Sequence, residues 1–279
     1  MTHDGPPDEL RLRFVKMEGA GNDYVYVDGV HQALALERVA AFAARIADRH
    51  YGVGGDGVIL MAPSRVADVR MVMWNADGSR GAMCGNGIRC VAKLAHDEGL
   101  VTGPDVVVET DAGVRRVTLV SEGGRVVGAR VAMGEVTLEA TPRHLSVDGR
   151  TYEYLVGDAG NPHAVVFVDD ELDHVPVARV GTALQTSPPF ATGVNVEFVR
   201  VDVDGSLHQR TFERGSGETL ACGSGATVAV VAAVRSGRVQ GPSVVVHLRG
   251  GDLTVEIEST RIVLQGPARE VFRGEIVLA

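Results

Sequence analysis

The hydrophobic positions of the chain follow two spacings, which predict a few helices among many short strands. Apolar residues three or four positions apart predict helices over 36–49, directly after Cys84, near 175–184 and directly after Cys222. Short runs rich in valine and isoleucine, bounded by turn residues, predict strands between these helices. The predicted strands are 25–27, 58–61, 69–74, 106–109, 114–120, 126–133, 143–147, 152–157, 164–168, 195–202, 209–213, 244–248, 253–257 and 262–264, and residues 1–12 are expected to be a frayed lead-in.

The order of these elements predicts an α/β fold of the α+β type. The strands do not alternate strictly with helices, so a doubly wound sheet fits less well. The apolar run 226–234 has no polar face, which predicts a helix buried on all sides. We therefore expect a curled, mostly antiparallel sheet around a central helix.

One turn sequence occurs twice, about half a chain apart. Cys84 begins C-G-N-G and Cys222 begins C-G-S-G, and a helical pattern follows each. The repetition predicts an internal duplication with two pseudo-symmetric domains, 1–130 and 131–267, with a hinge near 129–137. A two-fold relation between the halves would bring the N-termini of the two helices together across a cleft.

The position of the two cysteines favours acid–base chemistry. A helix N-terminus carries unpaired N–H groups and a partial positive charge, so the sequence predicts a lowered thiol pKa for Cys84 and Cys222. A single cysteine in a glycine turn is more often a small buried residue, but two in matching turns favour catalysis. Cys90, inside the first of these helices, is expected in the core. No metal site is expected, because the spacing of Cys84 and Cys90 is not that of zinc ligands.

Composition and charge exclude several classes of function. The net charge of −9 argues against nucleic acid or an anionic membrane as the partner. No apolar run reaches the roughly 18 residues of a membrane-spanning helix, and residues 1–9 lack the basic and apolar parts of a signal peptide. Three cysteines, an odd and small number, fit free thiols in a reducing cytoplasm.

Several longer motifs resemble those of the diaminopimelate epimerase family, over nearly the whole chain from about Phe14. They are G-A-G-N-D-Y (19–24), D-R-H-Y-G-V-G-G-D-G (48–57), N-A-D-G-S (75–79), C-G-N-G-I-R-C (84–90), G-N-P-H (160–163), G-V-N-V-E-F (193–198), E-R-G-S-G-E-T-L-A-C-G-S-G-A (213–226), G-G-D-L (250–253) and F-R-G-E-I (272–276). The chain departs from the family pattern at Gly57, where some members have glutamine, and at Glu18. The family fold has two similar halves, and its last strand, here within 268–279, returns to the first half.

The resemblance implies inversion of LL-diaminopimelate at one α-carbon to give the meso isomer, a step of lysine and cell-wall precursor biosynthesis. One cysteine acts as thiolate base and the other as thiol acid, which makes Cys84 and Cys222 the catalytic pair. Glu213 and His163 match positions that assist catalysis, although spacing alone leaves His163 equally consistent with the core. The substrate-binding positions implied are Asn22, Asn75, Gly85, Asn86, Asn161, Asn195, Glu213, Arg214, Gly223 and Ser224. The resemblance also implies a homodimer.

No cofactor is expected. An α-proton beside a carboxylate is weakly acidic, so the carbanion must be stabilised. Pyridoxal phosphate could do this through a Schiff-base lysine, but the chain has only Lys16 and Lys93, and neither lies in a phosphate-binding context. Two helix N-termini directed at the substrate carboxylate can hold the charge instead.

Three alternatives stay open. A racemase or epimerase of another amino acid on the same scaffold would not need the second anionic end for which Arg214 is suited. A thiol redox protein would also use thiols at helix N-termini, but it would not exchange an α-proton with solvent. A binding module would need neither cysteine.

Overall fold

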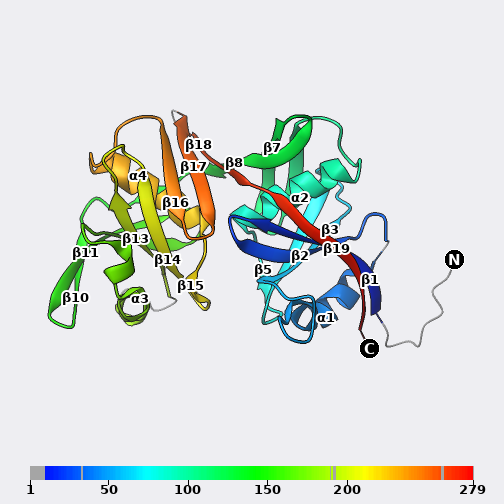
Figure 1. The fold of residues 1–279 in the computed structure, drawn as a ribbon, viewed down its shortest axis with the longest axis horizontal. Coiled ribbons are helices and arrows are strands. Elements are labelled where there is room, and N and C mark those ends of the chain that lie inside the picture. Colours follow the sequence, from blue (N-terminus) through cyan, green and yellow to red (C-terminus); the bar gives the residue numbers. More distant parts are fainter. Residues whose placement is uncertain (1–9, 33, 189, 191–192, 259–260, 279) are drawn as a thin grey trace. The chain divides into compact units, whose positions relative to one another are not determined.

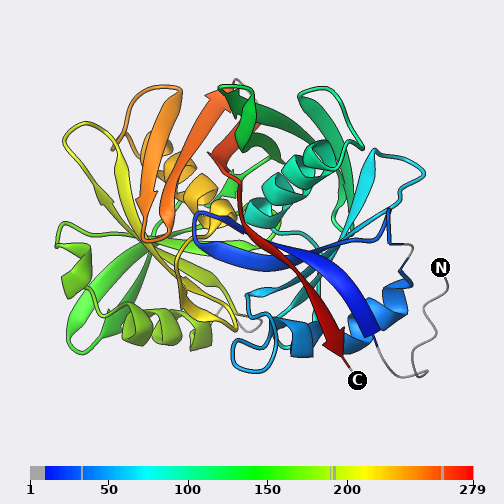
Figure 2. The same cartoon turned by 45° about the vertical axis from the view of Figure 1, so that its right-hand side comes forward.

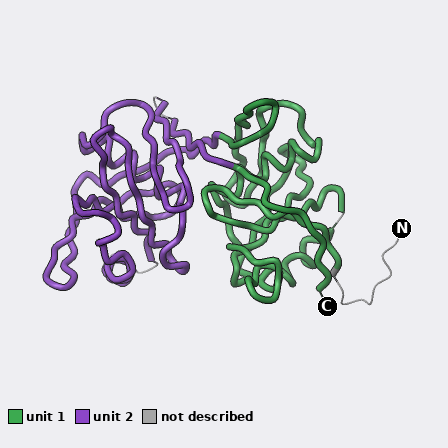
Figure 3. Tube along the Cα trace, viewed as in Figure 1, with its two compact units in different colours: residues 1–129, 268–279 green, residues 130–267 purple. Residues whose placement is uncertain are grey.

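The computed structural model describes residues 10–32, 34–188, 190, 193–258 and 261–278. The chain divides into two compact units, which Figure 3 colours separately. Unit 1 comprises residues 1–129 and 268–279, and unit 2 comprises residues 130–267. Unit 2 is therefore inserted between the main part of unit 1 and its last strand.

The described residues of unit 1 form two helices and a set of mostly antiparallel strands (Figure 1). The helices are α1 (Leu36–Ala47) and α2 (Gly85–Asp97). The strands are β1 (Leu10–Gly19), β2 (Asn22–Asp28), β3 (Gly57–Ala62), β4 (Val69–Asn75), β5 (Arg80–Gly81), β6 (Asp105–Thr110), β7 (Gly113–Glu122), β8 (Arg125–Gly134), which continues into unit 2, and β19 (Arg269–Leu278).

Unit 2 has the same kinds of element. Its helices are α3 (Val177–Thr186) and α4 (Gly223–Arg235), preceded by the short 3₁₀ turn η1 (Leu172–His174). Its strands are β9 (Thr137–Leu138), β10 (Arg143–Val147), β11 (Arg150–Asp158), β12 (Pro162–Phe167), β13 (Asn195–Val201), β14 (Leu207–Glu213), β15 (Gly217–Thr219), β16 (Ser243–Leu248), β17 (Gly251–Glu258) and β18 (Arg261–Pro267).

The two units repeat one strand order, which confirms the predicted duplication. In unit 1, β2 pairs in parallel with β3, β3 pairs antiparallel with β4, and β4 pairs antiparallel with β5 and, beyond α2, in parallel with β6. In unit 2, β12, β13, β14, β15 and β16 repeat these pairings in the same directions, with α4 in the place of α2. The pairs of β1 with β2 and β19, of β6 with β7, of β11 with β9, β10 and β12, and of β17 with β16 and β18 are antiparallel, so the predicted mostly antiparallel fold is also confirmed.

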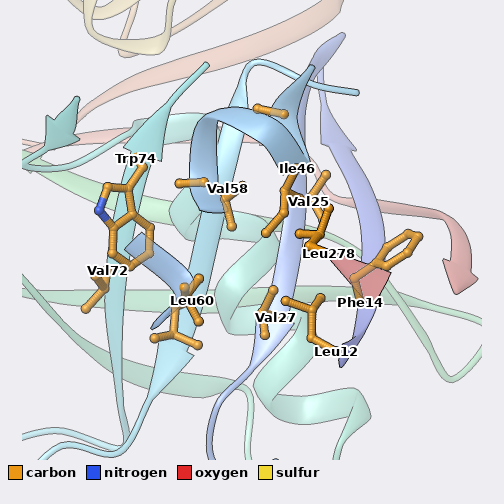
Figure 4. Packing of buried hydrophobic residues seen from close by; sticks show 13 residues of the cluster. Leu12, Phe14, Val25, Val27, Ile46, Val58, Leu60, Val72, Trp74 and Leu278 are labelled. Atoms are coloured by element: carbon orange, nitrogen blue, oxygen red, sulfur yellow. The ribbon is translucent and has the colours of Figure 1, made fainter. Parts of the chain in front are cut away.

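Strands β2, β3 and β4 of unit 1 are buried on both faces. On one face, Val25, Val58 and Leu60 pack with Ile46 of α1 in the cluster drawn in Figure 4. The other face meets α2, because a Cβ placed on Gly87 would lie 2.7 Å from the Ile59 side chain. Each large apolar side chain buried in this way contributes about 1.5–3 kcal/mol.

Helices α2 and α4 occupy the interior of their own units. Helix α2 packs against β1, β2, β3, β4, β6 and β7, and Figure 2 shows these strands around it. Helix α4 packs against β9, β11–β14 and β16–β18, and all its residues from 225 to 233 are buried. The predicted helix buried on all sides is confirmed. None of the helices in the described part of the chain is long and apolar enough to cross a membrane.

The first strand corrects the expectation of a frayed lead-in as far as residue 12. Strand β1 begins at Leu10 and pairs with both β2 and β19. Leu12 and Phe14 are buried while Arg11 and Arg13 are exposed, an alternation typical of a strand. A two-residue turn, Ala20 and Gly21 with φ of 56° and 79°, connects β1 to β2 and makes Asn22 the first residue of β2. Residues 1–9 lie outside the described part.

Candidate active site

The predicted site residues fall into two groups, one in each unit. Unit 1 holds the Cys84 site, which we define as Asn22, Asn75, Cys84, Gly85 and Asn86. Unit 2 holds the Cys222 site, which we define as Asn161, His163, Asn195, Glu213, Arg214, Cys222, Gly223 and Ser224.

Cys84 is the N-cap residue of α2. Its backbone is extended, with φ of −130°, and its sulfur accepts a hydrogen bond from the Gly87 N–H at 3.3 Å. The thiol in turn donates to the side-chain oxygen of Asn22 at 3.3 Å. Cys84 is partly exposed, so its sulfur combines a fixed position with access.

Asn22 is held by a network of charged residues that the sequence analysis did not single out. Its amide donates to Asp56 at 2.7 Å, and Asp56 also accepts from the backbone N–H of Asp23 at 3.1 Å. Arg49 bonds to both carboxylates, and Lys16 pairs with Asp23 at 2.5 Å. Burial raises the pKa of Asp56, and the charge of Asp23 adds to this. For Asp23, burial opposes but the Arg49 and Lys16 hydrogen bonds prevail, and its pKa is lowered.

Asn75 is the last residue of β4, and its side chain stabilises the turn that follows. Its amide donates to the Ser79 hydroxyl at 3.0 Å, and its backbone N–H donates to the Ser79 carbonyl at 2.9 Å. Ser79 also donates to Asp77. The turn delivers the chain to β5 and then to Cys84.

Helix α2 carries a buried guanidinium close to Cys84. Arg89 is fully buried and donates from Nη1 to the Gly85 carbonyl at 3.2 Å. Burial lowers its pKa, while Cys90, Cys84 and Tyr26 oppose the change, which places these groups in its surroundings. Cys90 is fully buried, as predicted, and burial raises its pKa to about 11.

Cys222 is the N-cap residue of α4 and lies among carboxylates. Its backbone is extended, with φ of −128°, and its sulfur lies 3.5 Å from the Ser224 hydroxyl. Glu213, the last residue of β14, accepts from the Thr219 hydroxyl at 2.5 Å. Burial raises the pKa of Glu213, and the charge of Glu197 raises it further.

The expected lowering of the Cys222 pKa is wrong. Burial raises the pKa of this thiol well above its usual value, and the charges of Glu213 and Glu197 act in the same direction. The Ser224 hydroxyl beside the sulfur opposes the shift but does not cancel it. The field of a helix N-terminus contributes only about 0.3–1 kcal/mol at exposed positions, which is less than one pKa unit. Burial beside like charges shifts a pKa by several units.

His163 is fully buried and has a polar neighbour at each ring nitrogen. Its Nδ1 is 2.9 Å from Glu197 Oε1, and its Nε2 is 3.1 Å from the side-chain oxygen of Asn161. His163 and Glu197 are both 0% exposed. A carboxylate accepts, so the bond to Glu197 places a proton on Nδ1, and the role of Nε2 towards Asn161 depends on the tautomer and on the orientation of the amide.

Asn195 and Arg214 are joined through the backbone. Asn195 lies opposite His163 in the parallel pairing of β12 and β13, and its side-chain oxygen accepts from the Arg214 N–H at 2.9 Å. The Arg214 side chain is exposed and passes over Gly193, where a Cβ would lie 2.6 Å from Arg214 Cδ. Asn195 therefore fixes the point from which this guanidinium extends.

The remaining predicted residues form the first turns of the two central helices. Gly85 and Gly223 are the first residues of α2 and α4. Their carbonyls accept from Arg89 and Thr227, respectively. Asn86 is buried, and Ser224 is partly exposed beside Cys222.

Sequence reasoning assigned no role to Asp56, Arg89 and Glu197. Glu197 interrupts the apolar residues of V-N-V-E-F, and a charged residue inside a buried strand is a usable signal. Arg89 falls outside the apolar stripe that predicts α2. Its burial arises because α2 is surrounded by strands.

Two groups of side chains in the described part have the spacing of metal ligands. In one, the ligating atoms of His163, Glu197 and Cys222 lie within 4.8 Å of one another, but His163 Nδ1 is already hydrogen-bonded to Glu197. In the other, His31 is bonded to Asp28, and Glu98 pairs with Arg273. Both lysines are ion-paired, Lys16 with Asp23 and Lys93 with Asp97.

The fold has two halves with the same strand order, and each half has a cysteine at the N-terminus of its central helix. An amino-acid epimerase shares this fold. A hydroxyproline epimerase from Agrobacterium vitis superimposes with a TM-score of 0.74 at 15% identity, over 96% of this chain and 91% of that one. This likeness concerns the fold.

Sequence comparison narrows the assignment. The family model described as diaminopimelate epimerase matches residues 14–139 and 156–271. The diaminopimelate epimerase of Geobacillus thermodenitrificans is 41% identical over 94% of this chain and 95% of its own length. That of Pelotomaculum thermopropionicum is 43% identical over 95% of this chain and 98% of its own length. The chain belongs to the diaminopimelate epimerase family.

Proposed function

We propose that the protein converts LL-diaminopimelate into meso-diaminopimelate by removing and replacing one α-proton, without a cofactor. The observation that carries the proposal is the matched position of Cys84 and Cys222, each the N-cap of the central helix of its unit. Membership of the family, and relatives named for this reaction, support the choice of substrate.

The proposed reaction uses one thiol from each unit. A thiolate takes the α-proton from one side of the carbon, and a thiol delivers a proton to the other side. The electron pair of the broken C–H bond is held meanwhile at the α-carbon and its carboxylate. N–H groups of Gly85, Asn86, Gly223 and Ser224, at the helix N-termini, are suited to stabilise that charge.

The surroundings of the cysteines support a division of labour in the free protein. Burial with Glu213 and Glu197 favours the thiol form of Cys222. The buried guanidinium of Arg89, in contrast, lies in the helix that Cys84 caps. We propose that Cys84 is the base for the L centre and Cys222 the base for the D centre.

The other residues are proposed to bind and orient the substrate. The exposed fork of Arg214 suits a bidentate bond to the distal carboxylate. Side chains of Asn22, Asn75, Asn161 and Asn195 offer donors and acceptors for the remaining polar groups. Glu213 and His163, both beside Cys222, are proposed to hold the reacting ammonium group and to assist proton transfer.

We also propose that the protein acts as a homodimer in the cytoplasm. The apolar side chains of Val271, Phe272 and Val277 are exposed on β19, which supports association of two copies there. All three cysteines are free, and the proposed chemistry requires a reducing compartment. Analytical ultracentrifugation tests the oligomer.

The function is tested by incubating the purified protein with LL-diaminopimelate in D2O under reducing conditions. The proposal predicts the meso isomer with deuterium at one α-carbon, in samples with no added cofactor. Parallel incubations with L-proline and L-glutamate test for a racemase of another amino acid. Turnover of either, without turnover of LL-diaminopimelate, would contradict the proposal.

A further inference from the structure

Glu197 is a buried carboxylate that has no contact with the substrate in the proposed reaction. It is the third residue of β13 and is 0% exposed. Its Oε1 accepts from His163 Nδ1 at 2.9 Å, whereas Oε2 is buried without a hydrogen-bond partner in the described part of the chain. An unsatisfied buried carboxylate oxygen destabilises a fold, so packing alone does not explain this residue.

The carboxylate lies against the N-terminus of α4. A Cβ placed on Gly225 would overlap Glu197 Oε1, so only glycine allows this approach. The ligating atoms of Glu197, His163 and Cys222 all lie within 4.8 Å of one another. The negative charge of Glu197 is therefore close to both the imidazole and the thiol.

Unit 1 shows which side chain the fold accepts at the position equivalent to Glu197. Ile59 is the third residue of β3, as Glu197 is of β13, and it packs against Gly87 of α2 as Glu197 packs against Gly225 of α4. Ile59 is fully buried. The fold thus accepts an apolar side chain there, which assigns the carboxylate to the chemistry of unit 2.

We propose that Glu197 is a positioning residue that orients His163 and keeps Cys222 in its thiol form in the free protein. The inference rests on the proposed function and deepens it. The bond to Nδ1 fixes the orientation of the His163 ring, with Nε2 directed at Asn161. The groups that face Cys222 are His163 from β12, Glu197 from β13, Glu213 from β14 and Ser224 from α4.

Glu197 thereby determines the protonation state of Cys222 before substrate binds. Removing a proton from Cys222 places a third negative charge beside two carboxylates, which is unfavourable in a buried site. The free protein therefore rests with Cys222 protonated and ready to deliver its proton. With Cys222 protonated, the Cys84 thiolate takes the α-proton. After one turnover Cys84 is the thiol and Cys222 is the thiolate.

The test is the pH dependence of Cys222 alkylation, resolved by mass spectrometry of its peptide. Glu197→Gln keeps the shape and removes the charge, and Glu197→Ile copies the other unit should the first variant not fold. The expected result is a midpoint lower by about one pH unit or more in either variant. Gln209→Met, which changes another buried polar residue of the neighbouring strand, is the matched control and should leave the midpoint unchanged.

An unchanged Cys222 midpoint in a folded Glu197 variant would overturn the inference. The result does not depend on the substrate, so it can fail while the epimerase proposal stands. With LL-diaminopimelate, Glu197→Gln should lower kcat by about tenfold or more and leave KM within about twofold, since Glu197 acts through His163 and Cys222. Equal loss in Gln209→Met would indicate a merely structural effect and would also contradict the inference.

Discussion

At the scale of single residues, two cysteines with the same helix position have opposite surroundings. Cys84 bonds to Asn22 and the Gly87 N–H and caps the helix that contains the buried Arg89. Cys222 lies among carboxylates that raise its pKa. Both thiols lie at a helix N-terminus, but only the Cys84 sulfur accepts a cap hydrogen bond, and the charged side chains around the two sulfurs differ. An argument from the helix alone therefore could not distinguish the two thiols.

Replacing Arg214 with lysine is predicted to impair use of diaminopimelate although the charge is kept. Lysine cannot reproduce the planar pair of donors that a carboxylate accepts. We expect kcat/KM to fall by a factor that corresponds to about 1.5–3 kcal/mol, the contribution of one charged hydrogen bond. Arg249→Lys, at an exposed ion pair with Glu218, is the control. Unchanged kcat/KM in folded Arg214→Lys would remove this residue from the site.

Cys90 is predicted to make stability depend on pH in the alkaline range. Its pKa is raised to about 11 in the folded state, so its contribution is complete below about pH 9 and is lost as the pH rises towards 11. Cys90→Val copies Val228, the residue at the same position of α4, and removes the titration. Between pH 8 and 10.5, denaturant unfolding should show the wild type losing about 1–2 kcal/mol more than the variant. Parallel pH profiles would show that Cys90 does not titrate in this way.

At the scale of elements, glycines in the first turns let both central helices approach their sheets. Gly87 meets Ile59, and Gly225 meets Glu197. Since the approach fixes where each N-cap cysteine lies, these contacts connect the packing of the helix to the chemistry of the site.

Gly225→Ala is accordingly predicted to displace the Glu197 carboxylate. Overpacking of this kind costs about 1–3 kcal/mol of unfolding free energy, and epimerase activity should fall together with the His163 bond. Gly103→Ala is a suitable control, because its added Cβ would meet nothing within 4 Å. Thermal unfolding and activity measured on both variants decide the matter, and a fully active, equally stable Gly225→Ala protein would refute the contact.

The alternation and periodicity of apolar residues were enough to predict the long elements. Helices α1 and α4 and strands such as β4 and β10 lie close to their expected ranges, because each is long enough for its apolar residues to show a pattern. The short strands β5, β9 and β15 were not predicted, because a segment of two or three residues is too short to show a periodic pattern. For the site, glycine turns and family motifs identified the cysteines. The roles of Glu197 and Arg89 depend on contacts between segments far apart in the chain, which no local pattern contains.

At the scale of the whole molecule, duplication provides two copies of one helix-capping cysteine on one scaffold. Equivalent positions have since diverged: Ile59 corresponds to Glu197, and Arg89 corresponds to Thr227. The two units thus bring a buried cation to one cysteine site and a buried carboxylate to the other. We infer that this difference gives two similar thiols the two different tasks that inversion of a carbon requires.

The most direct test of this account is elimination from diaminopimelate analogues that carry a leaving group at the β-carbon, measured in Cys84→Ser and Cys222→Ser. Elimination needs only removal of the α-proton, whereas epimerisation also needs delivery on the opposite side. Both variants should therefore lose epimerisation. Cys222→Ser should still eliminate from the L α-configuration, and Cys84→Ser only from the D configuration. Equal elimination of the same isomer by both variants would contradict a mechanism with one base in each unit.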